Sequence, residues 1–142
     1  MDNFVVIGGG PAGSTIAALL AKEGKKVLVF DTSVKRNLYV GESLIPATIP
    51  VIRRLQLEDK VKSFSVYKPG ASVWLDKNEC AVAAFGEGKG TLPPYAYNTN
   101  RIYFDQAIKD KAIEWGAQFE TEKLEVAFES DTCILSPDII EK

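Results

Sequence analysis

Hydrophobic positions at the start of the chain form two short runs on either side of a helical pattern. Residues 4–7 and residues 27–30 are continuously apolar, as is typical of buried strands in a parallel sheet. Between them, the stretch Pro11–Lys22 carries apolar residues at helical spacing and several alanines that permit close packing against a sheet. The order strand, helix, strand over residues 3–31 predicts a βαβ unit.

Further along the chain, helical and strand patterns alternate. After Ser130 the pattern fades, and we expect no strand between there and the end of the chain. The pattern predicts a helix over about residues 47–57, two strands at residues 71–76 and 80–85 joined by a turn, a helix from about residue 100 to Gly116, and a strand through residues 124–128.

A glycine turn separates the first predicted strand from the first helix. Gly8 permits a tight turn, Gly10 leaves room for the backbone to approach a pyrophosphate, and Gly13 lets the helix pack closely against the sheet. The N-terminus of the helix offers N–H groups to phosphates. Asp31 ends the second run, where its carboxylate can bind ribose hydroxyls and would repel the 2′-phosphate of NADP. The pattern predicts a dinucleotide site; an ordinary βαβ turn with a coincidental acid is the alternative.

Composition narrows the classes of function. The net charge of −2 gives no electrostatic case for binding nucleic acid or an anionic membrane. The absence of histidine removes Ser–His hydrolase chemistry and the usual zinc sites, so we expect no metal. Cys80 and Cys133 show no CxxC spacing and are expected to be free, buried thiols. Without a signal peptide or an 18-residue apolar stretch, a cytoplasmic location is the expectation.

Three blocks of sequence together resemble the class A flavoprotein monooxygenase superfamily, and within it the FAD-dependent halogenases. The first is the glycine turn with Asp31. The second, Gly41–Pro46, matches the GExxxP signature of that group, and the third, Arg101–Asp105, matches its R-x-x-F-D pattern at the start of a helix. These blocks span about residues 3–120. The resemblance implies FAD as the cofactor and an α/β, Rossmann-type dinucleotide-binding fold with a parallel sheet.

The resemblance also implies roles for individual residues. Arg36 stands one position before Asn37, where relatives often carry an arginine, and could substitute for it. Two of these residues have an alternative role that does not involve the cofactor. Glu42 could be a carboxylate that satisfies free N–H groups at the start of a helix, and Arg101 could be a solvated arginine at a helix start. The residues expected to bind the cofactor are Gly8, Gly10, Ala12 and Gly13 at the pyrophosphate, Asp31 at the adenosine ribose, Glu42 and Ser43 beside the FAD, and Arg36 and Arg101 at its phosphate or ribose side.

Lys68 is the expected catalytic residue, because Lys68-Pro69-Gly70-Ala71 resembles the K-x-G-A run of halogenases. In that family, reduced FAD and oxygen convert chloride or bromide into hypohalous acid, and the lysine captures or steers this oxidant onto an electron-rich ring. The resemblance therefore implies a small-molecule substrate, a halide ion and a separate flavin reductase as partners. An exposed lysine before a turn is the alternative.

The expected organisation is one N-terminal FAD-binding domain over residues 1–142, with the substrate domain absent. Its parts are the βαβ unit at 3–31, the flavin-covering segment at 41–57, the hairpin at 71–85, and the helix and strand at 100–128. We expect the FAD-binding portion of a halogenase-like oxidoreductase that acts on an electron-rich organic substrate. The alternatives are another FAD-dependent monooxygenase, a geranylgeranyl-reductase-like enzyme and a non-catalytic nucleotide-binding fragment.

Overall fold

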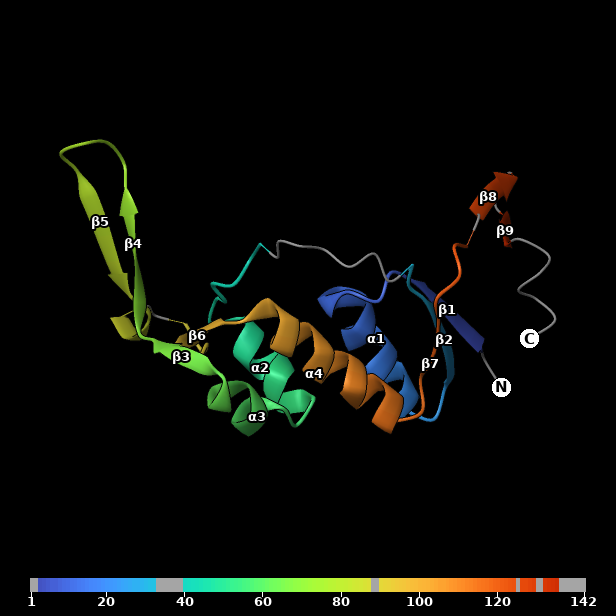
Figure 1. The fold of residues 1–142 in the computed structure, drawn as a ribbon. Helices are drawn as coiled ribbons and strands as arrows, with labels where there is room; N and C mark the ends of the chain where they lie inside the picture. The colour runs from blue at the N-terminus through green and yellow to red at the C-terminus, as the bar shows by residue number, and fades with distance from the viewer. Residues whose placement is uncertain (1–2, 33–39, 88–89, 125, 130–131, 136–142) are drawn as a thin grey trace. The chain divides into compact units, whose positions relative to one another are not determined.

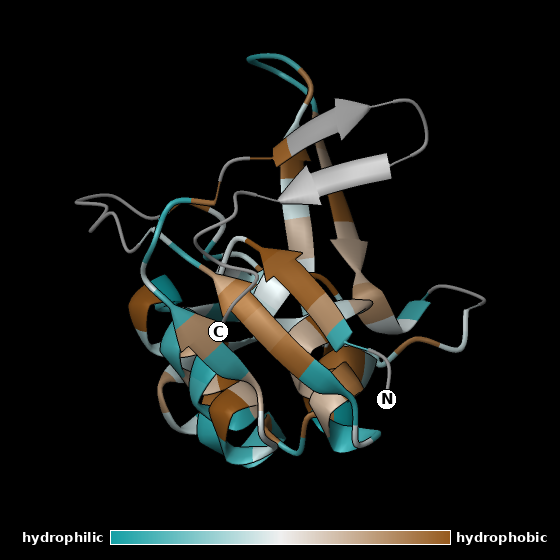
Figure 2. Cartoon of the chain, turned by 90° about the vertical axis from the view of Figure 1, so that its right-hand side faces the viewer, coloured by the Kyte–Doolittle hydropathy of each residue, from teal (hydrophilic) through white to brown (hydrophobic). Residues whose placement is uncertain are grey.

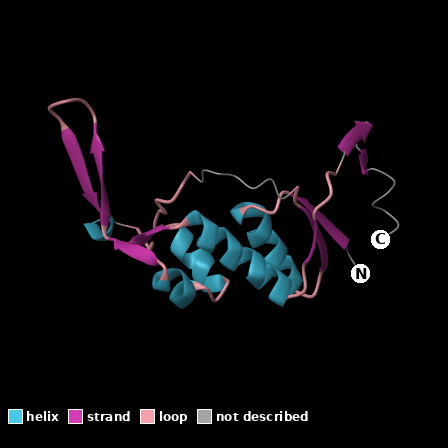
Figure 3. Ribbon diagram, viewed as in Figure 1, coloured by secondary structure: helices cyan, strands magenta, loops and turns pink. Residues whose placement is uncertain are grey.

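The structure is a computed structural model, and it describes residues 3–32, 40–87, 90–124, 126–129 and 132–135. This part of the chain contains both helices and strands (Figure 3). The chain divides into two compact units, which are described separately. The first comprises Met1–Lys35 and Lys111–Lys142, and the second comprises Arg36–Asp110. None of the helices in the described ranges has the length and hydropathy needed to span a bilayer.

A three-stranded parallel sheet forms the centre of the first unit (Figure 1). Its order is β1-β2-β7, with β1 at Asn3–Ile7, β2 at Lys26–Phe30 and β7 at Gln118–Glu120. Helix α1, at Pro11–Lys22, connects β1 to β2. The predicted βαβ unit and the α/β fold class are therefore confirmed, whereas β7 was not predicted.

Helix α1 begins and ends where its sequence signals place it. Pro11 occupies its first turn, where a missing N–H costs nothing, and Lys22 lies in its last turn near the negative end of the helix dipole. Gly24 follows the helix end with a φ of +75°, a left-handed conformation that favours glycine. Ala17 and Ala18 are fully buried, which fits the expectation that small side chains let this helix approach the sheet.

The other face of the parallel sheet is more open. Val5 and Ile7 of β1 are exposed, and Figure 2 shows apolar strand surface on this face. Phe30 packs with Leu124 in a small cluster on β2. After Leu124 in the chain, strand β8 at Val126–Glu129 pairs antiparallel with strand β9 at Thr132–Leu135. The expectation of no strand after residue 130 was wrong, because pairing with β8 makes this segment a strand without a clear alternation of its own.

The second unit contains two short helices in place of the single helix predicted over 47–57. Helix α2 spans Thr48–Arg54 and helix α3 spans Glu58–Ser63. Gln56 separates them with a φ of +58°, which breaks the helical path. The apolar positions at helical spacing are nevertheless the buried ones: Ile49, Ile52, Leu55 and Val61 are each at most 1% exposed.

Two strand pairs and a long helix complete the second unit. Strand β3 at Ser65–Lys68 pairs antiparallel with β6 at Ala96–Thr99, a pair that the sequence pattern did not predict. The predicted hairpin is confirmed as β4, Gly70–Trp74, paired with β5, Cys80–Ala84. Helix α4, at Arg101–Glu114, matches the helix predicted from about residue 100 and continues into the first unit.

The hairpin formed by β4 and β5 is largely exposed. Every residue of β5 is exposed, and Trp74 and Val82 are 68% and 76% exposed. Cys80 is a free thiol, as expected, but it is exposed, so the expectation of burial was wrong for it. A two-stranded hairpin has two faces, and neither face of β5 is covered by the described residues. The side chain of Cys133 lies outside the described residues.

A polar cluster links α2, α3 and the chain before β6. Arg53 Nε donates to Glu58 Oε2 at 2.6 Å, and Arg53 also donates to the Tyr95 hydroxyl at 2.8 Å. The Tyr95 hydroxyl donates in turn to Glu58. The hydrogen bond from Arg53 lowers the pKa of Glu58, while the hydrogen bond to Glu58 and burial raise the pKa of Tyr95. The cluster therefore favours an ionised Glu58 and a neutral Tyr95.

Candidate functional site

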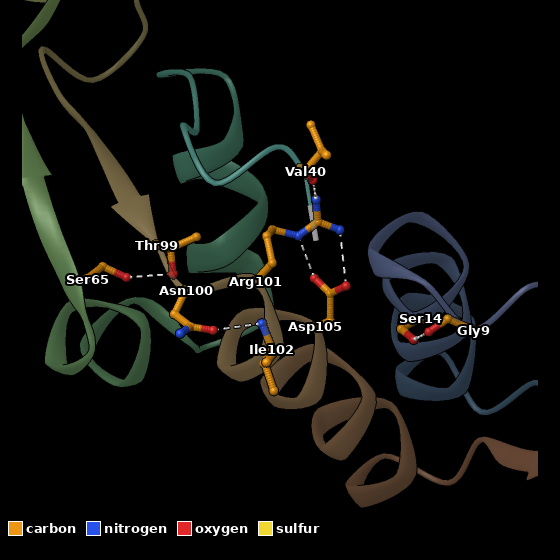
Figure 4. A network of polar contacts seen from close by, with 9 residues as sticks. All are labelled: Gly9, Ser14, Val40, Ser65, Thr99, Asn100, Arg101, Ile102 and Asp105. Atoms are coloured by element: carbon orange, nitrogen blue, oxygen red, sulfur yellow. Dashed lines mark hydrogen bonds and ion pairs between the residues drawn. The ribbon is translucent and has the colours of Figure 1, made fainter. Parts of the chain in front are cut away.

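The glycine turn begins at the carboxyl end of β1. Gly8 has a φ of +97°, a conformation that glycine adopts without strain, and its N–H donates to the Phe30 carbonyl of β2 at 2.8 Å. The expected tight turn at Gly8 is confirmed. Ser14 is fully buried, and its hydroxyl donates to the Gly9 carbonyl at 2.8 Å (Figure 4). This bond ties the turn to the first turn of α1.

Gly10 and Gly13 are glycines for different reasons. A Cβ on Gly13 would lie 1.8 Å from the Gly8 carbonyl oxygen, so the close approach of α1 to β1 requires glycine there, as expected. A Cβ on Gly10 would have no described atom within 4 Å, and the backbone of Gly10, with φ −69° and ψ −175°, suits any residue. The fold therefore requires Gly13 but does not require Gly10.

The N-terminus of α1 offers amide groups to the space beside Gly10. None of the described side chains caps this end of the helix, and Pro11 has no N–H. The amides of Ala12 and Gly13 belong to the first turn, where a helix supplies no acceptor for them. Together with the helix dipole, they suit an anionic group such as a pyrophosphate.

Asp31 follows β2 at the same edge of the sheet as the glycine turn, because parallel strands have their carboxyl ends on one side. Its backbone N–H donates to the Glu120 carbonyl of β7 at 2.9 Å. Its carboxylate lies beside Gly9: a Cβ on Gly9 would be 2.6 Å from Asp31 Oδ2. The structure thus brings the expected ribose-binding acid directly against the glycine turn.

The segment around Glu42 adds to the edge of β6. The Glu42 carbonyl accepts a hydrogen bond from the Thr99 N–H at 2.8 Å, and the Leu44 N–H donates to the Tyr97 carbonyl at 2.9 Å. Between them, Ser43 forms a β-bridge with Asn98. These backbone bonds fix the position of the segment that contains the predicted cofactor residues Glu42 and Ser43.

Arg101 holds the start of this segment from the first turn of α4 (Figure 4). Its guanidinium donates to both carboxylate oxygens of Asp105, at 2.8 and 3.0 Å, and to the Val40 carbonyl at 2.5 Å. A Cβ on Gly41 would lie 2.9 Å from an Arg101 nitrogen, and Gly41 has a φ of +92°, so glycine fits there on both grounds. Arg101 is 18% exposed, so it is not a freely solvated arginine.

Lys68, the last residue of β3, lies next to Ser43. Its ammonium nitrogen donates to Ser43 Oγ at 2.7 Å and to the Leu44 carbonyl at 3.1 Å. The same nitrogen lies 5.3 Å from the ring centroid of Phe85. Lys68 is therefore held in one place by the GExxxP segment, which argues against the alternative of a merely solvated lysine.

The predicted residues form two groups, one in each unit. In the first unit, the turn residues and Asp31 lie together at the carboxyl edge of the sheet. In the second unit, Glu42, Ser43, Lys68 and Arg101 are joined by β6 and the start of α4. Arg36 lies outside the described residues.

Sequence reasoning missed three residues of these groups. Gly9 makes room for Asp31, Ser14 ties the turn to α1, and Asp105 orients Arg101. The i, i+4 spacing of Arg101 and Asp105 is a signal that could have revealed their pairing. The roles of Gly9 and Ser14 depend on tertiary contacts that leave no periodic signal in the sequence.

The family model and the curated relatives of this chain are halogenases. Residues 3–93 match the family model described as tryptophan halogenase. Over 117 residues the chain is 38% identical to the flavin-dependent halogenase ArmH3 of Armillaria mellea, covering 80% of this chain and 23% of that protein.

The similar solved structures include both a halogenase and another flavoprotein. The myxobacterial chondrochloren halogenase CndH, an FAD-dependent halogenase, superposes with a TM-score of 0.77 at 27% identity, covering 94% of this chain and 34% of that one. A flavoprotein/dehydrogenase from Cytophaga hutchinsonii superposes with a TM-score of 0.79 at 26% identity, covering 95% of this chain and 34% of that one. The chain thus spans about a third or less of each of these relatives.

Proposed function

We propose, from the premise that the chain belongs to the tryptophan halogenase family, that it is the FAD-binding domain of a flavin-dependent halogenase. Because the chain spans only part of its relatives, the proposal assigns cofactor binding to this chain and halogenation to the whole protein that carries it. The substrate we propose is an electron-rich small molecule, with chloride or bromide as the second substrate and a separate flavin reductase as a partner. The cytoplasmic location expected from the sequence stays a prediction.

The observation that carries the proposal is the open position at Gly10. The fold does not require a glycine there, since neither the backbone conformation nor any neighbouring described atom excludes the side chain of another good N-cap residue such as serine or asparagine. A ligand that must approach the backbone at this position closely explains why the residue is a glycine. The first-turn amides of Ala12 and Gly13 supply donors for a pyrophosphate, and Asp31 supplies an acceptor for ribose hydroxyls.

The second group of residues supports the halogenase assignment. FAD, when bound and reduced, supplies the oxygen activation that converts halide into hypohalous acid. Lys68 presents an ammonium group held by Ser43 and Leu44, and an ammonium can donate a hydrogen bond to such an oxidant. We infer that Lys68 steers the oxidant toward the substrate, and that Glu42 and Arg101 keep the flavin-covering segment in place.

Titration with FAD tests the cofactor assignment. We expect Gly10→Val to abolish FAD binding, because its Cβ has no described atom within 4 Å and the new side chain occupies the space proposed for the ligand. Since Gly10 is the N-cap of α1, where valine is disfavoured, we expect a cost of about 1 kcal/mol in the free energy of unfolding. Asp31→Ala should weaken binding by at least tenfold, since a carboxylate that binds two hydroxyls is worth more than one hydrogen bond. Asp59→Ala, which removes an exposed carboxylate from α3, is the matched control. Unchanged affinity in both Gly10→Val and Asp31→Ala would refute the assignment.

A halogenation assay tests the role of Lys68 in the protein that carries this chain, supplied with FAD, a flavin reductase, NADH and bromide. Lys68→Ala should abolish halide incorporation while the reoxidation of reduced flavin by oxygen continues. Exposed Lys77, at the tip of the hairpin, provides the control Lys77→Ala. Retained halogenation in Lys68→Ala would remove this residue from the mechanism.

A flavoprotein that does not halogenate is the second candidate. The observation that favours it is the similarity to the Cytophaga hutchinsonii flavoprotein/dehydrogenase, which is as close in fold as the halogenase structure. The same assay separates the two: FAD binding and flavin reoxidation without any halide incorporation in the wild-type protein would favour this candidate.

A further inference from the structure

Three backbone segments converge at Lys68. Strand β6 lies between β3 on one side and residues 42–44 on the other. Lys68 is in register with Ala96 of β6, which is fully buried and carries only a methyl group. From β3, the long side chain of Lys68 therefore reaches past a small residue of the central strand to the segment on its far side.

At that segment, the ammonium group meets two oxygens from consecutive residues. Ser43 Oγ is 2.7 Å from the nitrogen and the Leu44 carbonyl oxygen is 3.1 Å from it. Within the described parts of the chain, these are the two hydrogen-bond acceptors of Lys68, so they use two of its three N–H groups. With two bonds fixed, the direction of the third N–H is fixed as well.

The Leu44 carbonyl is the less adjustable of the two acceptors. The N–H of Leu44 donates to the Tyr97 carbonyl, and its side chain is buried. Ser43 contributes a side chain to the contact, and its backbone is held by the bridge to Asn98. The Ser43 hydroxyl is thus the one acceptor of Lys68 that a substitution can remove without disturbing the backbone bonds.

We propose that Ser43 is a positioning residue for Lys68, and that its hydroxyl aims the third N–H of the ammonium at the reacting oxidant. This inference rests on the proposed function, in which Lys68 steers that oxidant. It changes the role expected for Ser43: the segment is still expected beside the flavin, but the hydroxyl serves the lysine and not the cofactor. A lysine has four rotatable side-chain bonds, and with the Leu44 carbonyl as the remaining acceptor the other two N–H groups have no fixed direction.

Competitive acetylation tests the contact without relying on activity. The protein that carries this chain is treated with limiting acetic anhydride, and the labelling of each lysine is measured by mass spectrometry. Ser43→Ala should raise the labelling of Lys68 about fivefold, as expected for losing one net hydrogen bond, while the other lysines stay unchanged. Ser43→Thr, which keeps the hydroxyl, should restore the wild-type value. Ser63→Ala is the matched control, since the Ser63 hydroxyl donates to a backbone carbonyl, that of Lys60.

Kinetics then connect the contact to function. Ser43→Ala should lower kcat for halide incorporation about tenfold, with unchanged KM for the organic substrate, unchanged FAD affinity and unchanged flavin reoxidation. Ser43→Thr should recover most of the lost kcat. Unchanged Lys68 labelling in Ser43→Ala, or a loss of FAD affinity in place of the kcat effect, would overturn the inference while leaving the proposed function standing. Full halogenation by Lys68→Ala would overturn the inference together with the role proposed for Lys68. The absence of any halide incorporation by the wild-type protein would instead overturn the proposed function.

Discussion

The carboxylate of Asp31 lies against the backbone of Gly9, so closely that a Cβ on Gly9 would be 2.6 Å from Asp31 Oδ2. These two residues follow neighbouring parallel strands, and their contact joins the glycine turn to the acid at the carboxyl edge of the sheet. The contact gives Gly9 a definite role beside Gly8, Gly10 and Gly13.

Gly9→Ala should therefore displace Asp31. The added methyl group overlaps three atoms of the aspartate side chain, so either the turn or the carboxylate must move. We expect a loss of about 1–3 kcal/mol in the free energy of unfolding, as is usual for overpacking, and a tenfold or greater loss of FAD affinity. Urea denaturation and FAD titration measure the two effects.

The matched control for this prediction is Gly90→Ala. The nearest described neighbour to a Cβ added on Gly90 is 3.9 Å away, an ordinary van der Waals distance. Its substitution should leave both quantities unchanged. If Gly9→Ala behaves like Gly90→Ala, the contact with Asp31 does not constrain the turn.

Ser14→Ala should loosen the same turn from the helix side. It removes the hydrogen bond to the Gly9 carbonyl from a fully buried position. We expect a loss of about 1 kcal/mol in stability, and a severalfold weaker affinity for FAD because the turn is less well fixed. Ser63→Ala removes an exposed hydroxyl and should change neither the stability by more than a few tenths of a kcal/mol nor the affinity. Equal effects of the two substitutions on FAD affinity would contradict the prediction.

Arg101→Lys should destabilise the second unit although it keeps the charge. A lysine cannot donate to both oxygens of Asp105 and to the Val40 carbonyl in the planar geometry of a guanidinium. Because both charged side chains are about four-fifths buried, at 18% and 20% exposure, we expect a loss of about 1–2 kcal/mol in the free energy of unfolding. Arg54→Lys, at an exposed arginine of α2, is the control. A loss no larger than that of Arg54→Lys would argue against the Arg101 contacts.

The cluster around Glu58 predicts a dependence of stability on pH. The pKa of Glu58 is lowered in the folded state, mainly by the hydrogen bond from Arg53. The stabilisation that ionised Glu58 gives to the folded state is therefore complete above the ordinary glutamate pKa of 4.5. It is lost as the pH falls through the lower pKa of the folded state. We expect Glu58→Gln to cost about 1 kcal/mol at pH 7, and we expect this difference from the wild type to shrink below about pH 4.5.

Asp59→Asn controls for the loss of a negative charge beside Glu58. Asp59 is exposed in the same turn of α3, so its substitution should change stability little at any pH. The measurement is urea denaturation from pH 3 to pH 7. A difference between wild type and Glu58→Gln that stays constant down to pH 3 would contradict the lowered pKa.

Several elements could be predicted because their signals are local. Helix α1 has the predicted bounds, since Pro11, the alanines and Gly24 each act within a turn or two of their own position. The hairpin β4–β5 and helix α4 were also predicted from short-range patterns. The sequence pattern did not predict four short strands, β3, β6, β7 and β9. A strand of three or four residues is too short to show a clear alternation of apolar and polar positions, and it forms because it pairs with another strand.

By itself, the sequence determined the βαβ unit, the glycine turn, the acid after β2 and the resemblance to flavin-dependent halogenases. These features depend on local backbone preferences and on motifs read in order along the chain. Only the tertiary structure decided that Gly9 is required by Asp31 and that Gly10 is not required by the fold. It alone also decided that Lys68 meets Ser43, 25 positions away in the chain. Such contacts follow from which strands pair and in which register, and pairing between distant segments is settled by packing of the whole unit.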